Sequence, residues 1–142
     1  MRSAMRISTL CMVAASSALV ILSAPNAASR PAQNVQAIEM TAQKYNYDPA
    51  TVRVKQGSKV QLKITAQDRK HGFKMSAYPD GAETKGALGL LFTAAQDCWT
   101  LEQGTPTVIE FVAQTPGTYT FKCCHFCGTG HGKMKGELVV EP

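Results

Sequence analysis

One short stretch of the chain holds most of its metal-binding chemistry and dictates what the rest must support. Residues 123–134 read Cys-Cys-His-Phe-Cys-Gly-Thr-Gly-His-Gly-Lys-Met and contain three of the five cysteines and two of the three histidines. Thiolate, imidazole and thioether are soft or borderline donors, which favour copper over magnesium, calcium or manganese. No carboxylate interrupts the stretch, and its three glycines allow tight backbone turns. A short loop of this kind can bring all its donors to one centre.

The number of thiols in this loop bears on the number of metal ions. A single blue-copper ion uses one cysteine, two histidines and a weak axial methionine. Here the spacing is Cys-x3-Cys-x3-His-x2-Met, with thiols at both Cys123 and Cys127. The second thiol favours two metal ions that share bridging sulfurs.

The loop resembles the binuclear copper centre, CuA, of cytochrome c oxidase subunit II and of nitrous oxide reductase. The segment 126–131, Phe-Cys-Gly-Thr-Gly-His, and an upstream His-Gly-Phe at 71–73 carry the resemblance. It implies two copper ions and a further histidine from an upstream strand, for which His71 is the candidate. It also implies a backbone carbonyl ligand two residues after the first cysteine. The ligand set implied by this resemblance is His71, Cys123, the carbonyl of His125, Cys127, His131 and Met134.

Plainer interpretations of these residues remain open. Cys123 could be a buried core thiol, Met134 a core residue that fills a gap, and His71 an ordinary surface histidine. Zinc also binds sets of two cysteines and two histidines. The Cys-x2-Cys at 124–127 would elsewhere indicate a redox disulfide, but no βαβ pattern surrounds it. Met40 and Met75 lack ligand spacing and are expected to be packing residues.

The first 29 residues are typical of a secretory signal peptide. Arg2 and Arg6 form a basic start, residues 10–24 are apolar, and small residues follow. The apolar run is short for a bilayer span. We therefore expect a signal peptide at 1–29, a linker at 30–34, a domain at 35–142 and a periplasmic or otherwise exported location. No transmembrane helix is expected in the mature chain, whereas oxidase subunit II is usually held by such helices.

Alternating apolar and polar residues predict short strands separated by turns. Residues 59–66 alternate most clearly, and residues 45–49 are expected to form a bend. Residues 76–104 are less regular and are predicted to form a long crossover loop with a helical turn or a short helix. Six to eight such strands indicate an antiparallel two-sheet sandwich. The resemblance to cupredoxins implies an all-β, Greek-key β-sandwich. The strands are expected at 35–42, 51–55, 59–66, 107–113, 118–123 and 136–141.

Two cysteines remain once two thiols are assigned to metal. Along a strand, Cys124 should point to the side opposite Cys123. Exported proteins tolerate disulfides, so Cys98 and Cys124 could pair and pin the long loop beneath the site. The alternative is two free thiols.

The charge of the mature chain is mildly basic. Removing Arg2 and Arg6 leaves 13 basic and 10 acidic residues, a net charge of 13 − 10 = +3. There is no long basic run, and nucleic-acid binding has little support. Several basic residues flank the predicted ligands and would form either a rim that steers an acidic partner or a set of solvated charges. They are Arg69, Lys70, Lys74, Lys133 and Lys135.

The predicted function is one-electron transfer through a cysteine-bridged pair of copper ions. No side chain is assigned as an acid, base or nucleophile, so the chain is not expected to be an enzyme by itself. It would serve as the electron-receiving part of a cytochrome c oxidase-like complex. Its partner would be a redox protein such as a cytochrome or a terminal oxidase or reductase. Two alternatives stay open: a single blue copper held by His71, Cys127, His131 and Met134, or periplasmic copper delivery or storage.

Overall fold

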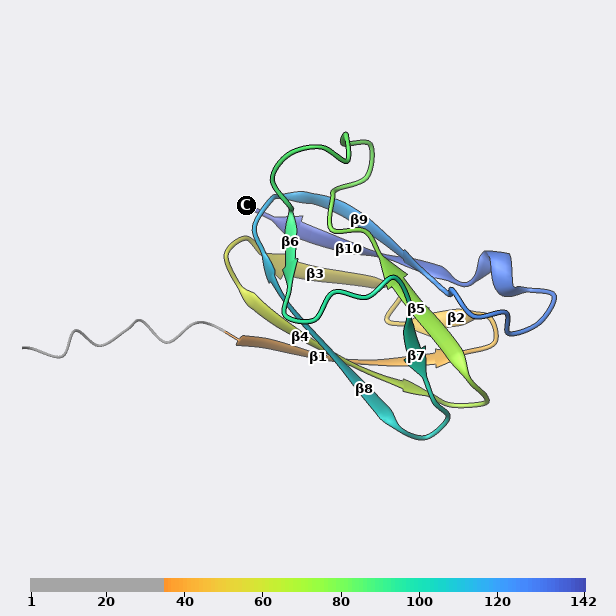
Figure 1. Ribbon diagram of the computed structural model, residues 1–142. Helices are drawn as coiled ribbons and strands as arrows, with labels where there is room; N and C mark the ends of the chain where they lie inside the picture. Colours follow the sequence, from red (N-terminus) through yellow and green to blue (C-terminus); the bar gives the residue numbers. More distant parts are fainter. Residues whose placement is uncertain (1–34) are drawn as a thin grey trace, which may run out of the picture. The chain divides into compact units, whose positions relative to one another are not determined.

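The computed structural model describes residues 35–142, which form two β-sheets packed face to face (Figure 1). The predicted signal peptide at 1–29 and linker at 30–34 lie outside the described residues. Within residues 35–142, no helix is long and apolar enough to cross a membrane.

The first sheet has the strand order β2-β1-β4-β8-β6. Its centre is β4, which pairs with β1 on one side and β8 on the other. The strands are β1 (Val35–Gln43), β2 (Asn46–Asp48), β4 (Lys59–Ala66), β6 (Leu90–Phe92) and β8 (Pro106–Ala113).

The second sheet has the order β3-β10-β9-β5-β7 and carries the residues discussed below. Its central strands, β9 and β10, are joined by the loop that contains the predicted ligands (Figure 1). The strands are β3 (Thr51–Lys55), β5 (His71–Met75), β7 (Trp99–Leu101), β9 (Gly117–Lys122) and β10 (Lys135–Glu141).

The core lies between the sheets because each strand buries alternate residues. In β4, Val60, Leu62 and Ile64 are buried and face the other sheet. An aromatic cluster fills the end of the core near the predicted ligands. Its neighbouring rings, 5.1 to 6.1 Å apart between centroids, are Tyr47, Phe73, Phe121, Trp99, Phe92 and Phe111.

The structure confirms the β-sandwich and corrects three details. Each sheet contains one parallel pair, β1 with β4 and β3 with β10, so the sandwich is not purely antiparallel. The parallel pairs arise because the chain changes sheet between the paired strands. The predicted bend at 45–49 contains the short strand β2. The predicted helical turn in residues 76–104 is wrong, because that segment holds the short strands β6 and β7 and no helix.

Candidate metal centre

The candidate ligand loop runs from the end of β9 to the start of β10. Cys123 follows the last residue of β9, and Met134 precedes the first residue of β10. The amide of Cys123 donates to the carbonyl of Met134 at 3.0 Å, which closes the base of the loop. A single 3-10 turn, η1 (His131–Lys133), is the loop's regular structure. The antiparallel pairing of β9 and β10 therefore holds both ends of the donor pattern together.

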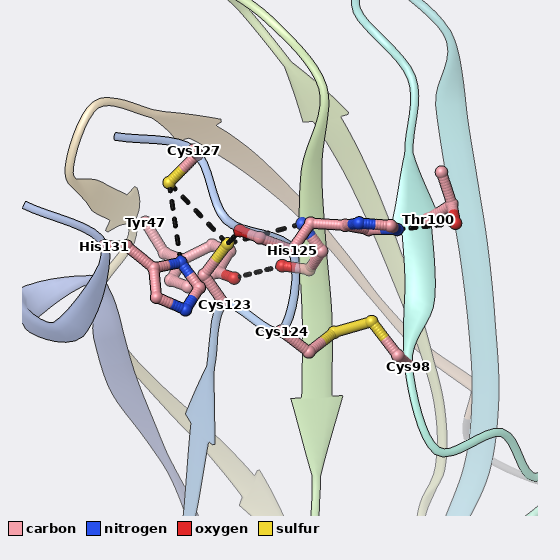
Figure 2. The surroundings of a disulfide bond; sticks show 9 residues. Tyr47, Cys98, Thr100, Cys123, Cys124, His125, Cys127 and His131 are labelled. Atoms are coloured by element: carbon pink, nitrogen blue, oxygen red, sulfur yellow. Dashed lines mark hydrogen bonds between the residues drawn. A yellow bond between two sulfur atoms is a disulfide. The ribbon is translucent and has the colours of Figure 1, made fainter. Parts of the chain in front are cut away.

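The sulfur of Cys127 lies at the centre of the donor cluster. It is 3.9 Å from the sulfur of Cys123, 3.8 Å from Nδ1 of His131 and 3.9 Å from Sδ of Met134. Figure 2 shows Cys123, Cys127 and His131 gathered at one point. Both thiols are buried and neither belongs to the disulfide, and the Met134 side chain is buried as well. The loop thus brings together all four side-chain donors that the spacing predicts.

His71, at the start of β5, reaches the same cluster from another strand. Ligand atoms of His71, Cys123 and Cys127 all lie within 4.8 Å of one another. The histidine is fully buried, and its Nε2 lies 2.7 Å from Oδ1 of Asp68. Because an ionised carboxylate only accepts hydrogen bonds, Nε2 carries the proton and Nδ1 keeps a free lone pair. The plainer interpretation of His71 as an ordinary surface histidine is therefore wrong.

Asp68 is a candidate positioning residue for His71 that sequence reasoning missed. A carboxylate that accepts from a ligating histidine fixes the ring's tautomer and orientation. Desolvation is the largest single influence on the pKa of Asp68 and raises it, but the hydrogen bonds from His71 and from the Lys44 amide, with the charge interaction of His71, together lower that pKa. Its position three residues before His71 was the available signal.

His125 presents its backbone, and not its ring, to the cluster. The carbonyl oxygen of His125 lies 3.1 Å from the sulfur of Cys123. The ring points away, and its Nε2 lies 3.3 Å from the hydroxyl of Thr100 on β7 (Figure 2). This arrangement agrees with the carbonyl role expected for His125.

Two further groups lie beside the Cys123 sulfur. The amide of Gly72 donates to it at 3.4 Å. The hydroxyl of Tyr47 donates to the carbonyl of Gly72 at 2.5 Å. Burial is the main cause that raises the pKa of Tyr47, and the nearby thiols raise it further, so its hydroxyl stays protonated. These bonds tie β2 and β5 to the first thiol of the loop.

Burial also affects the second thiol. Burial is the main cause that raises the pKa of the Cys127 thiol to about 11, and the neighbouring Cys123 thiol adds to the shift. Without a metal, Cys127 therefore keeps its proton at neutral pH. A metal ion binds this residue by displacing that proton.

Tyr45 packs beneath the glycine-rich half of the loop. A Cβ atom at Gly128 or Gly130 would collide with its ring. Gly128 also has a φ of 130°, a conformation that side chains rarely adopt. The glycines therefore let the loop lie flat against Tyr45, a partner that the sequence did not reveal.

The structure confirms the disulfide between Cys98 and Cys124. It joins the segment before β7 to the ligand loop, on the face opposite the Cys123 sulfur (Figure 2). Cys124 lies against Gly72, where a Cβ atom would meet its sulfur. Closing a chain segment with a sequence separation of 26 stabilises the fold by about 3 to 4 kcal/mol. The bond holds residues 123–125 against β5 and β7.

Part of the predicted basic rim is already engaged within the described residues. Arg69 donates to the carbonyl of Cys127 at 3.4 Å, and Lys70 pairs with Glu102 at 2.7 Å. Both therefore have partners of their own. Lys74, Lys133 and Lys135 are exposed and have no ion pair among residues 35–142.

The donor set fits copper on two grounds. The first is chemical, because two thiols, two imidazoles and a thioether form a soft set with no carboxylate among the converging atoms. The second is Nδ1 of His71, the one buried side-chain nitrogen or oxygen of residues 35–142 that has no hydrogen-bond partner. An unpartnered buried polar atom is costly, and a metal ion would satisfy it.

Comparison with known proteins relates the chain to cytochrome c oxidase subunit 2. Two sequences named cytochrome c oxidase subunit 2, both from Thermus thermophilus, are 26% identical over 108 residues. The match covers 76% of this chain but only 67% and 54% of those proteins. The chain thus spans about half to two thirds of their length.

Two solved structures share the fold. One is the periplasmic domain of subunit II of cytochrome oxidase from Bradyrhizobium japonicum, with a TM-score of 0.57 and 15% identity over 75% of this chain and 83% of that one. The other is auracyanin A, a blue copper protein from Chloroflexus aurantiacus, with a TM-score of 0.54 and 15% identity over 75% of this chain and 99% of that one. The sequence also matches the cupredoxin-like domain family over residues 11–140. The chain therefore belongs to the cupredoxin-like domain family.

Proposed function

We propose that this chain is a copper-binding electron-transfer protein whose centre holds two copper ions bridged by Cys123 and Cys127. The observation that carries the proposal is the pair of buried sulfurs 3.9 Å apart, with further donors beside each of them. His131 and Met134 lie beside Cys127, and the carbonyl of His125 lies beside Cys123. His71 completes the set from β5.

The protein's part in this function is to hold the donors still. Cys123 and Cys127 would hold the copper ions, which would supply one-electron oxidation and reduction at this site. The disulfide, the contact of Tyr45 with the loop glycines and the Asp68–His71 hydrogen bond all restrain the ligands. The Gly72 amide donates toward the Cys123 sulfur and stabilises negative charge on it. A fixed donor set keeps the structural change on electron transfer small.

Partner and location follow from the relatives. Because the chain is related to oxidase subunit II, we propose a terminal oxidase or a cytochrome as its electron partner. We also propose that it acts in the periplasm or another exported compartment, consistent with the signal peptide expected at 1–29 and the disulfide. Neither role gives the chain a catalytic side chain of its own.

The test is copper stoichiometry with and without the first thiol. Wild-type protein should bind two copper ions and show a paramagnetic spectrum in which one unpaired electron is shared by two copper nuclei. The Cys123→Ser variant should bind one copper ion and lose that shared spectrum. The Met40→Leu variant, at a buried core methionine on β1 outside the donor set, serves as the control and should still bind two.

Other outcomes would favour the alternatives. A wild-type protein that binds one copper ion with a strong blue absorption band, unchanged by Cys123→Ser, would contradict the bridged pair. Such a result would favour a single copper at His71, Cys127, His131 and Met134. Tight Cu(I) binding without reversible oxidation and reduction would favour copper delivery.

A further inference from the structure

Three lysines form a continuous row across the outer face of the second sheet. Lys74 on β5 lies directly opposite Lys122 on β9, and Lys122 lies directly opposite Lys135 on β10. All three side chains are exposed. Directly opposed residues on neighbouring strands have Cβ atoms roughly 5 Å apart. We call Lys74, Lys122 and Lys135 the lysine row.

The lysine row carries uncompensated charge. Like charges directly opposed across strands destabilise a sheet. Within residues 35–142 no member of the row forms an ion pair, whereas Lys59 and Lys63 on the other sheet each pair with a glutamate. The three opposed ammonium groups cost stability and have no acidic partner within the described residues. This fits an acidic partner on another molecule.

Three acids lie near the row: Glu137 and Asp80 on the side away from the metal loop, and Asp97, which lines the cleft beside Lys74 and Lys122 but pairs with neither. Glu137 comes two residues after Lys135 along β10. Asp80 is held by Thr120, whose backbone amide and hydroxyl both donate to its carboxylate. Toward the loop, the same face carries Gly72, the disulfide sulfur of Cys124 and Thr100, none of which is charged.

The row lies next to the candidate metal centre in the chain. Lys122 immediately precedes Cys123, and Lys135 immediately follows Met134. The cysteine and methionine point inward, whereas the lysines point to solvent. Lys74 and Lys122 also line a cleft of about 710 Å³ between the sheet and the crossover segment. A protein seated on the row would therefore lie one residue of backbone away from two candidate ligands.

We propose that the lysine row is a docking surface for an acidic redox protein that exchanges electrons with the metal centre. The inference rests on the proposed electron-transfer function for its purpose, but docking itself is measured without electron transfer. Complementary charge steers association and fixes orientation more than it adds affinity. Carboxylates of the partner would also relieve the repulsion among the three ammonium groups.

The experiment measures binding of a defined acidic probe, a plant-type [2Fe–2S] ferredoxin, to the full chain with and without copper. The test variant carries Lys74→Gln, Lys122→Gln and Lys135→Gln. The matched control, Lys55→Gln with Lys59→Gln and Lys63→Gln, removes the same charge elsewhere. A third variant replaces the row by arginines and keeps its charge. Dissociation constants are measured at low salt and at about 150 mM salt, where screening acts within about 8 Å.

The expected result is a loss of affinity at low salt that depends on the row. The glutamine row variant should bind about tenfold more weakly, while the control and the arginine variant bind nearly as well as wild type. Thermal unfolding checks that every variant is folded. Equal loss in the row variant and the control would overturn the proposal, because net charge alone would then explain binding.

Two more outcomes separate this proposal from other readings. Absence of ferredoxin binding together with row-dependent binding to phosphatidylglycerol vesicles would overturn it in favour of a membrane surface. Row-dependent ferredoxin binding by a protein that holds no copper pair would uphold the docking surface and contradict the proposed centre. The two proposals therefore fail independently.

Discussion

At the scale of single residues, the arrangement around His71 shows how the protein prepares one donor atom. The ring is fully buried, its Nε2 is held by Asp68, and its Nδ1 has no hydrogen-bond partner. In the neutral ring, a proton on Nε2 held by the carboxylate leaves Nδ1 with the free lone pair that a metal ion needs. The orientation of this ligand is thus set before any ion arrives.

Removing the Asp68 carboxylate should weaken copper binding. We expect Asp68→Ala to lower copper affinity by about tenfold to a hundredfold, because the ring loses its orienting acceptor. Asp68→Asn keeps an acceptor oxygen and should lose less. Competition with a copper chelator measures the effect, and Asp80→Asn, a carboxylate that bonds Thr120, is the control. Unchanged affinity in Asp68→Ala would contradict the role given to this residue.

The donors could be predicted from sequence, whereas their supports could not. Cys123, Cys127, His131 and Met134 lie in one short stretch whose spacing has chemical meaning by itself. Tyr45 acts through contacts with a distant segment, and no local pattern distinguishes it from an ordinary surface residue, whereas the one signal for Asp68 is its position three residues before His71. Their roles depend on which strands become neighbours, which only the folded chain reveals.

At the scale of elements, the ligand loop has little regular structure and is held from outside. Its one 3-10 turn spans three residues. The disulfide fixes its beginning, and Tyr45 supports its glycine-rich middle. The pairing of β9 with β10 fixes its two ends. Rigidity of the loop therefore comes from neighbouring elements.

The contact with Tyr45 can be tested by adding one methyl group. Gly130→Ala should lower the free energy of unfolding by about 1 to 3 kcal/mol, because its Cβ would overlap the Tyr45 ring. Gly130 has a φ of −88°, so the cost is steric and not a backbone effect. Gly132→Ala is the matched control, since nothing lies within 4 Å of its Cβ.

Denaturant unfolding measures both variants. In a Tyr45→Ala background the cost of Gly130→Ala should largely disappear, since the overlapping ring is gone. Equal destabilisation by Gly130→Ala and Gly132→Ala would contradict the role of Tyr45. The role of Tyr45 would also be contradicted if Gly130→Ala destabilised the Tyr45→Ala protein as much as it destabilises wild type.

Two short strands, β6 and β7, show where the prediction of elements from sequence failed. Strong alternation located β4 with its correct bounds. The segment 76–104 was predicted as a loop with a helical turn, yet it contains β6 and β7. Each of these strands has only three residues, too few to show a period of two. Both form because a longer neighbour, β8 or β5, offers backbone groups for pairing.

At the scale of the whole domain, the candidate centre lies at the edge of the core and shares three buried residues with it. The core is a layer of apolar side chains between two five-stranded sheets. The donors lie at one end of that layer and contribute only Cys123, Cys127 and Met134 to its buried apolar set. The fold class was predictable because alternation repeated over many strands carries more information than any one strand.

Metal removal should therefore leave the domain folded but less stable. The metal-free protein should keep its β-sheet circular dichroism, unlike small metal-dependent domains that unfold without their ion. Copper should raise the thermal midpoint, and the gain should grow with free copper concentration because only the folded state presents the assembled site. Calorimetry at several copper concentrations measures this. A random-coil spectrum after chelation would show that the core does not fold without the metal, and would contradict this prediction.

The position of β10 has a consequence for biosynthesis. This strand lies between β3 and β9, and it is the last of the described strands along the chain. A nascent chain that ends at Met134 already carries every donor, yet nothing closes the base of its loop or fills the central gap in the second sheet. The loop is therefore closed for metal binding only after β10 has been synthesised and has paired with β9.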